Sequence, residues 1–296
     1  QRKSCRPRCH LSMSSDFPKP TIVAFVADLM FTMRIAKVIE HIGYDVVWIE
    51  SAAQLVSQSE RVAPEFIGEQ LHGHEGRLFE EIVRIQPALM LFDLNNADVP
   101  WREWIALLKS AAATRRIPIM CFGPHEDVDA MTTAKSAGAD VVLGRSRFTS
   151  DMPALLQRYA RIPDRHALES ACAEPLSDLA KEGIERFNRG DFYPAHDALE
   201  EAWVIDQGAG RDLYRGILQV GIAYYQIEQG NSRGAVKMLL RVRQWLAPLP
   251  PVCRGVDVAA LRDDVEQAYS ALMTLGPDRV EDFDRQLFKP VIIHQQ

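Results

Sequence analysis

Short apolar runs alternate with amphipathic stretches along the first half of the chain. The apolar runs are partly β-branched, as buried strands are, and the amphipathic stretches carry apolar residues at helical spacing. The runs expected as strands are residues 21–27, 45–50, 88–94, 117–123 and 140–144. The stretches expected as helices are residues 33–43, 101–111, 128–139 and 151–162. This alternation predicts an α/β fold with a parallel sheet covered by helices on both faces.

The second half of the chain carries the helical pattern almost throughout. The expected helices span residues 176–190, 193–205, 211–230, 231–250 and 256–276. Asn231 is the expected N-cap of the fourth of these helices, and "PVIIHQQ" is a short extended tail. Because the connections are short, neighbouring helices should pack antiparallel, which predicts an all-α bundle.

The chain has 296 residues, enough for two ordinary domains. Residues 163–174 are polar and break the strand–helix alternation, so we expect a linker between a domain at 20–162 and one at 175–296. Residues 1–19 are basic and aperiodic and are expected to be a disordered leader, with Met13 as an alternative start. Residues 52–77 are interpreted as an insertion in the first domain.

Composition is typical of a globular protein, with 47% apolar and 25% charged residues. A net charge of −6 gives no overall attraction to nucleic acid, and no run of about 18 apolar residues predicts a membrane span. We therefore expect neither nucleic acid nor membrane as a partner. The scattered Cys121, Cys172 and Cys253 fit a reducing cytoplasm, with Cys121 as a buried thiol.

Two small groups of metal-binding residue types lack the further ligands that a metal site needs. Cys5, Cys9 and His10 have no second pair at suitable spacing. His72 and His74 have no third ligand, so they are expected to be ordinary surface residues. No cofactor is expected at either place.

The five strand–helix units, Asp93 at the end of the third strand and "KSAGADVVLGRSRF" before the last helix resemble the receiver domain of response regulators. The resemblance covers about half of the chain and implies a doubly wound five-stranded sheet of the CheY type. It also implies that Asp93 matches the aspartate that receivers phosphorylate with the help of Mg²⁺.

Three positions depart from the receiver pattern. The acidic pair after the first strand is here Ala27-Asp28, the Ser or Thr after the fourth strand is Gly123, and the Lys after the fifth strand is replaced by Arg145. A hard cation loses an oxygen ligand, and the phosphoryl group loses a hydroxyl donor. We therefore expect a degenerate receiver, or pseudo-receiver, with phosphorylation of Asp93 as the alternative.

The ordered motifs "FNRGDFYPAHDALEEAW" and "GILQVGIAYYQIEQGNSRGA" resemble the family called domain of unknown function 309. The resemblance covers nearly all of residues 176–250 and implies a small helical bundle without an established function. Two positions depart from the family pattern. Asp197 follows His196 where members often carry Glu, and Gln226 stands where many have a histidine.

Polar residues of these motifs share helix faces. His196 and Glu200 are four residues apart, which places them on one face of a helix. The expected picture has His196, Glu200 and Gln219 facing each other across a helix pair, with an arginine balancing a glutamate. The full set of candidates is His196, Glu200, Glu201, Trp203, Arg211, Arg215, Gln219, Gln226 and Asn231.

Three interpretations of this cluster stay open. It is a buried polar network that fixes helix register, or His196 and Glu200 are metal ligands or an acid–base pair. H-x-x-x-E supplies two ligands at most, whereas a catalytic metal site wants three. The third interpretation is a small-ligand or partner pocket lined by Tyr193, Trp203, Tyr224, Tyr225 and Arg215.

For the whole chain, the leading hypothesis is a cytoplasmic regulatory or adaptor protein rather than an enzyme. Its pseudo-receiver would make contacts through the surface near the fourth and fifth strands, and its helical domain would bind a protein partner or small ligand. No recognisable DNA-reading helix-turn-helix or basic stripe is found. The alternative is a metal-dependent hydrolase centred on His196 and Glu200, with a divalent metal as cofactor.

Overall fold

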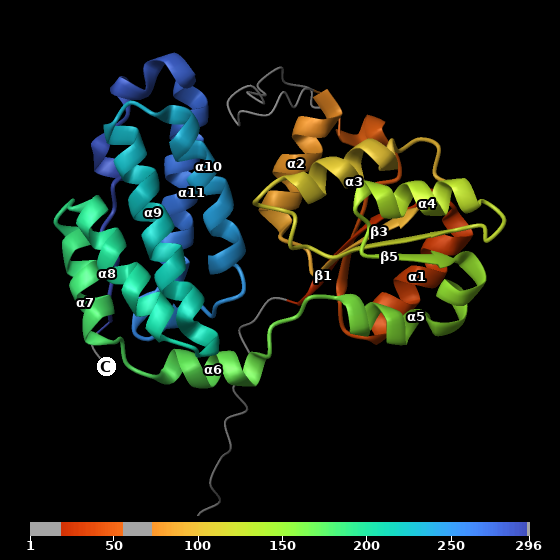
Figure 1. Ribbon diagram of the computed structural model, residues 1–296, viewed down its shortest axis with the longest axis horizontal. Coiled ribbons are helices and arrows are strands. Elements are labelled where there is room, and N and C mark those ends of the chain that lie inside the picture. The colour runs from red at the N-terminus through yellow and green to blue at the C-terminus, as the bar shows by residue number, and fades with distance from the viewer. Residues whose placement is uncertain (1–18, 56–72, 295–296) are drawn as a thin grey trace, which may run out of the picture.

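The computed structural model describes residues 19–55 and 73–294 of the protein. The two halves lie side by side, and helix α6 (Arg165–Ala173) runs along the base of the helical half (Figure 1). Among the described residues, no helix has the length and apolar character needed to span a membrane. Residues 1–18, with Cys5, Cys9 and His10, lie outside the described residues, as does His72.

The first half contains a parallel five-stranded sheet with the order β2-β1-β3-β4-β5. Its strands are β1 (Thr21–Phe25), β2 (Asp45–Trp48), β3 (Leu89–Asp93), β4 (Ile119–Gly123) and β5 (Val141–Gly144). This is the strand order of flavodoxin and CheY, and such sheets place ligands outside the carboxyl ends of their strands. The predicted α/β, doubly wound fold is confirmed.

Helices cover both faces of this sheet (Figure 1). They are α1 (Leu29–His41), α2 (Gly73–Ile85), α3 (Trp101–Ser110), α4 (Val128–Ala137) and α5 (Arg145–Tyr159), with a 3-10 turn at Ala52–Leu55. Helices α1 and α5 share one apolar core with the sheet, and α2, α3 and α4 share the core on the opposite face. Every residue of β3 and β4 is buried, which explains their continuous apolar sequence.

Two features of this half differ most from the prediction. Helix α2 is absent from the expected elements, and its first residues fall in the stretch interpreted as an insertion. It buries Leu78 and Ile82 against the sheet, and Phe79 and Val83 lie on the neighbouring stripe. Helix α5 begins at Arg145, six residues before the expected start. His74 lies exposed in α2.

The second half is a helical bundle, as predicted. Its main helices are α7 (Asp178–Asn188), α8 (Phe192–Ile205), α9 (Asp212–Glu228), α10 (Ser232–Leu246) and α11 (Val258–Leu275), with 3-10 turns at Ala209–Arg211, Pro277–Asp282 and Arg285–Leu287. Helix α9 is its apolar centre and packs between α8 and α10 (Figure 1). Asn231 is the N-cap of α10, since its side chain accepts a hydrogen bond from the Gly234 N–H at 2.9 Å.

A short hairpin that the sequence pattern did not predict precedes α11. Strands β6 (Val252–Cys253) and β7 (Val256–Asp257) pair antiparallel, and Ile293 of the extended tail bridges to Val256. The two residues of its turn, Arg254 and Gly255, have φ values of 54° and 82°. Two consecutive positive φ values are what a type I′ hairpin turn requires.

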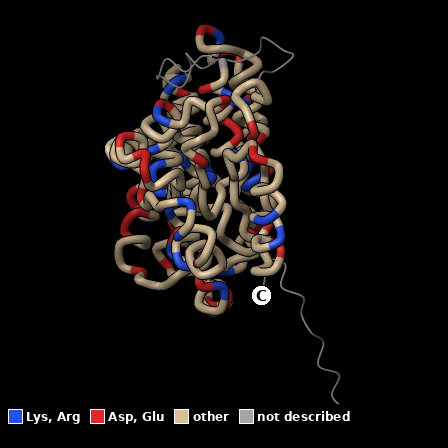
Figure 2. The backbone as a smooth tube through the Cα atoms, turned by 90° about the vertical axis from the view of Figure 1, so that its right-hand side faces the viewer, with Lys and Arg blue, Asp and Glu red and all other residues tan. Residues whose placement is uncertain are grey.

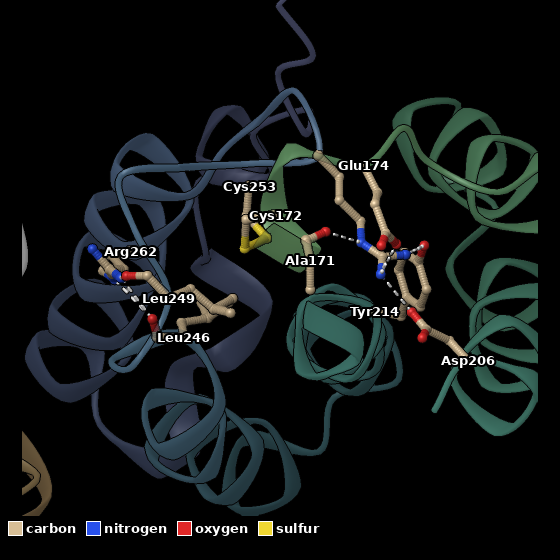
Figure 3. Close-up of a disulfide and its surroundings, with 10 residues drawn as sticks. Ala171, Cys172, Glu174, Asp206, Tyr214, Leu246, Leu249, Cys253 and Arg262 are labelled. Carbon is tan, nitrogen blue, oxygen red and sulfur yellow. Dashed lines mark hydrogen bonds and ion pairs between the residues drawn. A yellow bond between two sulfur atoms is a disulfide. The ribbon is translucent and has the colours of Figure 1, made fainter. Parts of the chain in front are cut away.

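The stretch expected as a linker, residues 163–174, contains helix α6. Asp164 caps the helix by accepting from the Ala167 N–H at 3.1 Å, and Leu168 and Cys172 are buried in the core of the helical half. Cys172 forms a disulfide with Cys253 of the hairpin (Figure 3). The helical half therefore begins its packing within the predicted linker, while the domain boundaries at 20–162 and 175–296 stay a prediction.

The two halves touch through α2, the end of α3 and α10. Phe79, Val83, Ala111 and Ala113 belong to the same apolar cluster as the helical bundle. The Gln244 side chain of α10 donates a hydrogen bond to the carbonyl of Ala112 at 3.4 Å. A cavity lies beside this contact and is lined by residues from both halves.

Candidate functional site

The carboxyl ends of the strands bring Asp28, Asp93 and Arg145 together, as the receiver resemblance implied. Asp93 ends β3 and is 3% exposed. Arg145 begins α5, and its Nη2 lies 2.6 Å from Asp93 Oδ2. Its Nη1 lies 4.0 Å from Asp28 Oδ2. One guanidinium therefore faces both carboxylates.

The remaining carboxylate oxygens also have partners. Asp93 Oδ1 accepts a hydrogen bond from the Asn95 N–H at 3.0 Å, and Asp28 Oδ1 caps α1 by accepting from the Phe31 N–H at 3.0 Å. Burial raises the pKa of Asp93, while the Asn95 N–H and Arg145 act in the opposite direction. Asp28 is thus a helix cap as well as a neighbour of Arg145.

Arg145 is further fixed by aromatic rings. Its guanidinium carbon lies 5.0 Å from the Phe31 ring centre and 5.7 Å from that of Phe122. A Cβ at Gly123 would lie 3.1 Å from Leu94 Cβ, which is tighter than ordinary packing. A side chain at position 123 would therefore require Leu94 to shift.

The histidine motif of α8 lies at the surface of the bundle. His196 is partly buried, and its Nδ1 lies 3.3 Å from Asp197 Oδ1. Glu200 and Glu201 are exposed, and within the described part of the chain neither forms an ion pair with an arginine. Across residues 19–55 and 73–294, no three His, Cys, Asp or Glu side chains gather to hold a metal ion. The hydrolase alternative finds no third ligand there.

Gln219 has a different partner from the one expected. It is 5% exposed and accepts a hydrogen bond from Trp245 Nε1 at 3.1 Å, so it points toward α10 rather than toward His196. The predicted meeting of His196, Glu200 and Gln219 is therefore wrong. Gln226 accepts from Asn231 Nδ2 at 2.7 Å, which places it at the N-terminus of α10 as part of the cap.

Arginines and tryptophans alternate in a stack that joins the halves. The Arg211 and Arg215 guanidinium carbons lie 5.3 and 4.7 Å from the Trp203 ring centre. Arg215 also lies 4.0 Å from the Trp245 ring, and Arg116, from the first half, lies 4.6 Å from that ring. Arg215 is thus held between two indoles. Rather than balancing Glu200 or Glu201, Arg211 and Arg215 stack on Trp203.

Sequence reasoning identified Trp203, Arg211 and Arg215 but missed Trp245 and Arg116. Trp245 faces Arg215 and Gln219 from α10, four residues on from Arg241. The signal available was its place among apolar positions of α10, which indicates burial but not its partners. Arg116 lies in the other half, and no local pattern links it to the bundle.

The carboxylate of Asp212 lies among the arginines of the stack. Burial raises its pKa, and Arg215, Arg211, Arg116 and Arg161 all oppose that rise. The pKa of Arg215 is lowered by burial and by the like charges of Arg116 and Arg241. This region therefore has an excess of positive charge.

The predicted pocket of Tyr193, Trp203, Tyr224, Tyr225 and Arg215 is not one site. Tyr224 is fully buried against Phe187, Phe192 and Phe288, whereas Tyr193 is exposed and lies 5.5 Å from Tyr225 between ring centres. Trp203 and Arg215 belong to the stack instead. Aromatic residues at these spacings serve mainly as core.

A buried arginine that the sequence did not indicate ties the hairpin to the bundle. Arg254 is 6% exposed, its Nη2 lies 2.8 Å from Asp206 Oδ2, and its Nε donates to the Ala171 carbonyl at 3.2 Å. It also donates to the Tyr214 hydroxyl. Figure 3 shows Asp206, Glu174 and Tyr214 converging beside the disulfide. These partners hold the buried cation within the fold, so the cluster is structural.

The cysteines behave only partly as expected. Cys121 is a buried thiol, as predicted, and burial raises its pKa. Cys172 and Cys253, 81 residues apart, are joined rather than scattered. Because disulfides are rare in reducing compartments, cysteine usage no longer argues for one.

Comparisons with known proteins match each half separately. The family model "Domain of unknown function (DUF309)" matches residues 180–238. An uncharacterised protein of Aquifex aeolicus is 29% identical over 92 residues, which is 31% of this chain and 28% of the relative's length. The match therefore spans well under half of that relative.

Solved structures that resemble the chain match its first half. The phosphorylated cyanobacterial phytochrome response regulator RcpA is 13% identical, with a TM-score of 0.35, over 48% of this chain and 94% of its own. The receiver domain of a Pseudomonas aeruginosa PAO1 sensor histidine kinase is also 13% identical, with a TM-score of 0.36, over 48% of this chain and 98% of its own. The protein thus combines a receiver-like α/β half with a helical half in which residues 180–238 match the family of unknown function.

Proposed function

We propose that this protein is a two-domain regulatory or adaptor protein whose receiver-like half is held in one state by Arg145 instead of being switched by phosphorylation. The observation that carries the proposal is the 2.6 Å ion pair between Arg145 and the buried Asp93. The guanidinium faces Asp93 and Asp28 at once, as a bound cation would. Receivers use Mg²⁺ and a transferred phosphoryl group at this place, and here both would have to displace Arg145.

The glycine at position 123 supports the same proposal. A phosphoryl group needs fixed donors around it, and Gly123 has no side-chain donor and is crowded by Leu94. The missing hydroxyl donor at Gly123 and the pairing of Asp93 with Arg145 would both oppose phosphorylation. The helical half would then be the binding module, for a protein partner or a small ligand rather than for nucleic acid or a membrane.

The direct test is to incubate the protein with acetyl phosphate and Mg²⁺ and to measure its intact mass. We expect no stoichiometric addition of a phosphoryl group. Asp93→Asn is the matched control for modification elsewhere. Stoichiometric addition in the natural protein that disappears in Asp93→Asn would overturn the proposal.

A gain-of-function variant sharpens this test. Ala27→Asp with Arg145→Lys restores two receiver-type residues and removes the planar guanidinium from the acidic site. We expect measurable Mg²⁺-dependent modification of Asp93 in this double variant. If the variant folds and stays unmodified, Arg145 is not the sole obstacle to phosphorylation, and the missing donor at Gly123 remains as the other.

A further inference from the structure

The cavity between the two halves combines an apolar wall with charged side chains. Its volume is about 350 Å³, and it lies between the segment after α3, the segment after α5 and the C-terminal end of α10. Most of its wall is apolar, with Ile117, Leu168 and Pro248 among the lining residues. This volume is of the size that holds a small organic molecule.

Two arginines border the cavity with free guanidinium groups. Arg116 and Arg161 both line it and both are exposed. Within residues 19–55 and 73–294, neither side chain has a hydrogen bond or an ion pair; Arg116 is oriented by stacking on Trp245. The pKa of Arg161 is lowered by burial and by the charge of Arg116, which indicates that the two cations repel each other.

Two carboxylates, Asp164 and Asp212, also line the cavity, and the arginines outnumber them only when Arg211 and Arg215 behind Asp212 are included. Asp164 lines it but uses an oxygen to cap α6. Asp212 lines it and has no ion pair within 4.0 Å in the described part of the chain, although four arginines act on its pKa. Arg215 and Arg211 add positive charge behind it.

The amide of Gln244 adds a polar group to the wall. Its Nε2 donates to the carbonyls of Arg241 and Ala112, but its Oε1 is buried and has no hydrogen-bond partner. A buried acceptor without a partner is costly. A hydroxyl or amide donor on a bound molecule would satisfy it.

We propose that this cavity binds a small organic anion, with its carboxylate, phosphate or sulfonate group between Arg116 and Arg161 and its apolar body against the wall formed by both halves. Arginine forks match oxyanions geometrically. The apolar wall selects against inorganic ions, which offer nothing to bury. The proposal is independent of the state of Asp93, since the cavity does not include it.

A matched pair of fluorescent probes tests this inference. Anilinonaphthalene sulfonate has an apolar body with an anionic group, and phenylnaphthylamine has a similar body without the charge. We expect the anionic probe to bind the full chain, and Arg116→Ala with Arg161→Ala to weaken it at least about tenfold, since the charged hydrogen bonds to its sulfonate are lost. Arg115→Ala is the control in the same loop, because Arg115 does not line the cavity.

The outcomes separate clearly. The proposal stands if the double variant weakens binding of the anionic probe and Arg115→Ala retains it. It is overturned if the neutral probe binds as tightly as the anionic one, or if the double variant keeps full affinity for the anionic probe. Thermal unfolding of each variant shows that lost binding is not lost folding.

Discussion

Arg145 in the receiver-like half and Arg215 in the helical half are both held in place, but by different groups. Arg145 faces two carboxylates, Asp93 and Asp28, as well as two phenylalanine rings. Arg215 lies between the faces of Trp203 and Trp245. Carboxylates cancel the charge of an arginine, whereas aromatic faces orient it and leave most of its charge in place.

This difference explains why the two regions suggest opposite uses. The carboxylates at the end of the sheet already have a partner within the protein, so an incoming cation or phosphoryl group must displace Arg145. The stacked region keeps an excess of positive charge, so it attracts anions to the neighbouring cavity. Figure 2 shows that charges of both signs are interspersed along the backbone, so this excess is a local property.

The largest effect is expected for Trp245→Ala. Trp245 is 2% exposed, touches two guanidinium groups and donates to Gln219. Removing it should lower the free energy of unfolding by about 3–5 kcal/mol. Denaturant unfolding followed by circular dichroism measures this loss. Trp245→Phe keeps a ring for the arginines and should cost less, and equal losses in the two variants would show that stacking contributes nothing.

A smaller loss is expected for Arg145→Ala, because Asp93 would keep its buried charge without its partner. Arg145 is partly exposed, so we expect about 1–3 kcal/mol rather than the full cost of breaking a buried pair. Adding Asp93→Asn should recover part of this loss, since the uncompensated charge is then gone. Strict additivity of the two changes in denaturant unfolding would contradict the ion-pair interpretation.

The pH dependence of stability sharpens the account of the acidic site. Burial raises the pKa of Asp93, so the folded protein binds this proton more readily than the unfolded chain. The contribution of Asp93 to stability therefore falls as pH rises from its unfolded value, about 3.9, through its folded pKa. An amide does not titrate, so the stability of Asp93→Asn lacks this dependence on pH. On acidification from neutral pH, the unfolding free energy of the natural protein should therefore rise relative to that of Asp93→Asn. A fall instead would mean that Arg145 outweighs burial and lowers the pKa of Asp93.

Much of the fold followed from local patterns, because strand and helix periods are properties of short stretches. The β3 and β4 strands and helices α7 to α11 lie close to their expected bounds. Helix α2 was missed because its apolar positions follow two glycines in a stretch without other pattern. The two-residue strands of the β6–β7 hairpin are too short to show a period.

The sites were less predictable than the fold, and the reason is geometric. Asp28, Asp93 and Arg145 could be expected together because parallel strands end at one edge. Gln219 and Trp245 are 26 residues apart, and their contact depends on how α9 and α10 are rotated against each other. Arg116 reaches the stack only because the halves pack through α2 and α10. The spacing of residues along the sequence predicts neither the rotation of two packed helices nor the packing of the two halves.

The smallest effect is expected for Arg215→Met, which keeps apolar bulk between the two indoles and removes the charge. Two cation–π contacts of about 0.5–1 kcal/mol each are lost, but repulsion from Arg116, Arg211 and Arg241 is relieved. The net change in thermal stability should therefore be small at low salt. Salt screens the repulsion, so raising the ionic strength should stabilise the natural protein more than the variant. If salt affects both alike, the arginines do not carry the excess charge, and Arg215 is then only a packing residue.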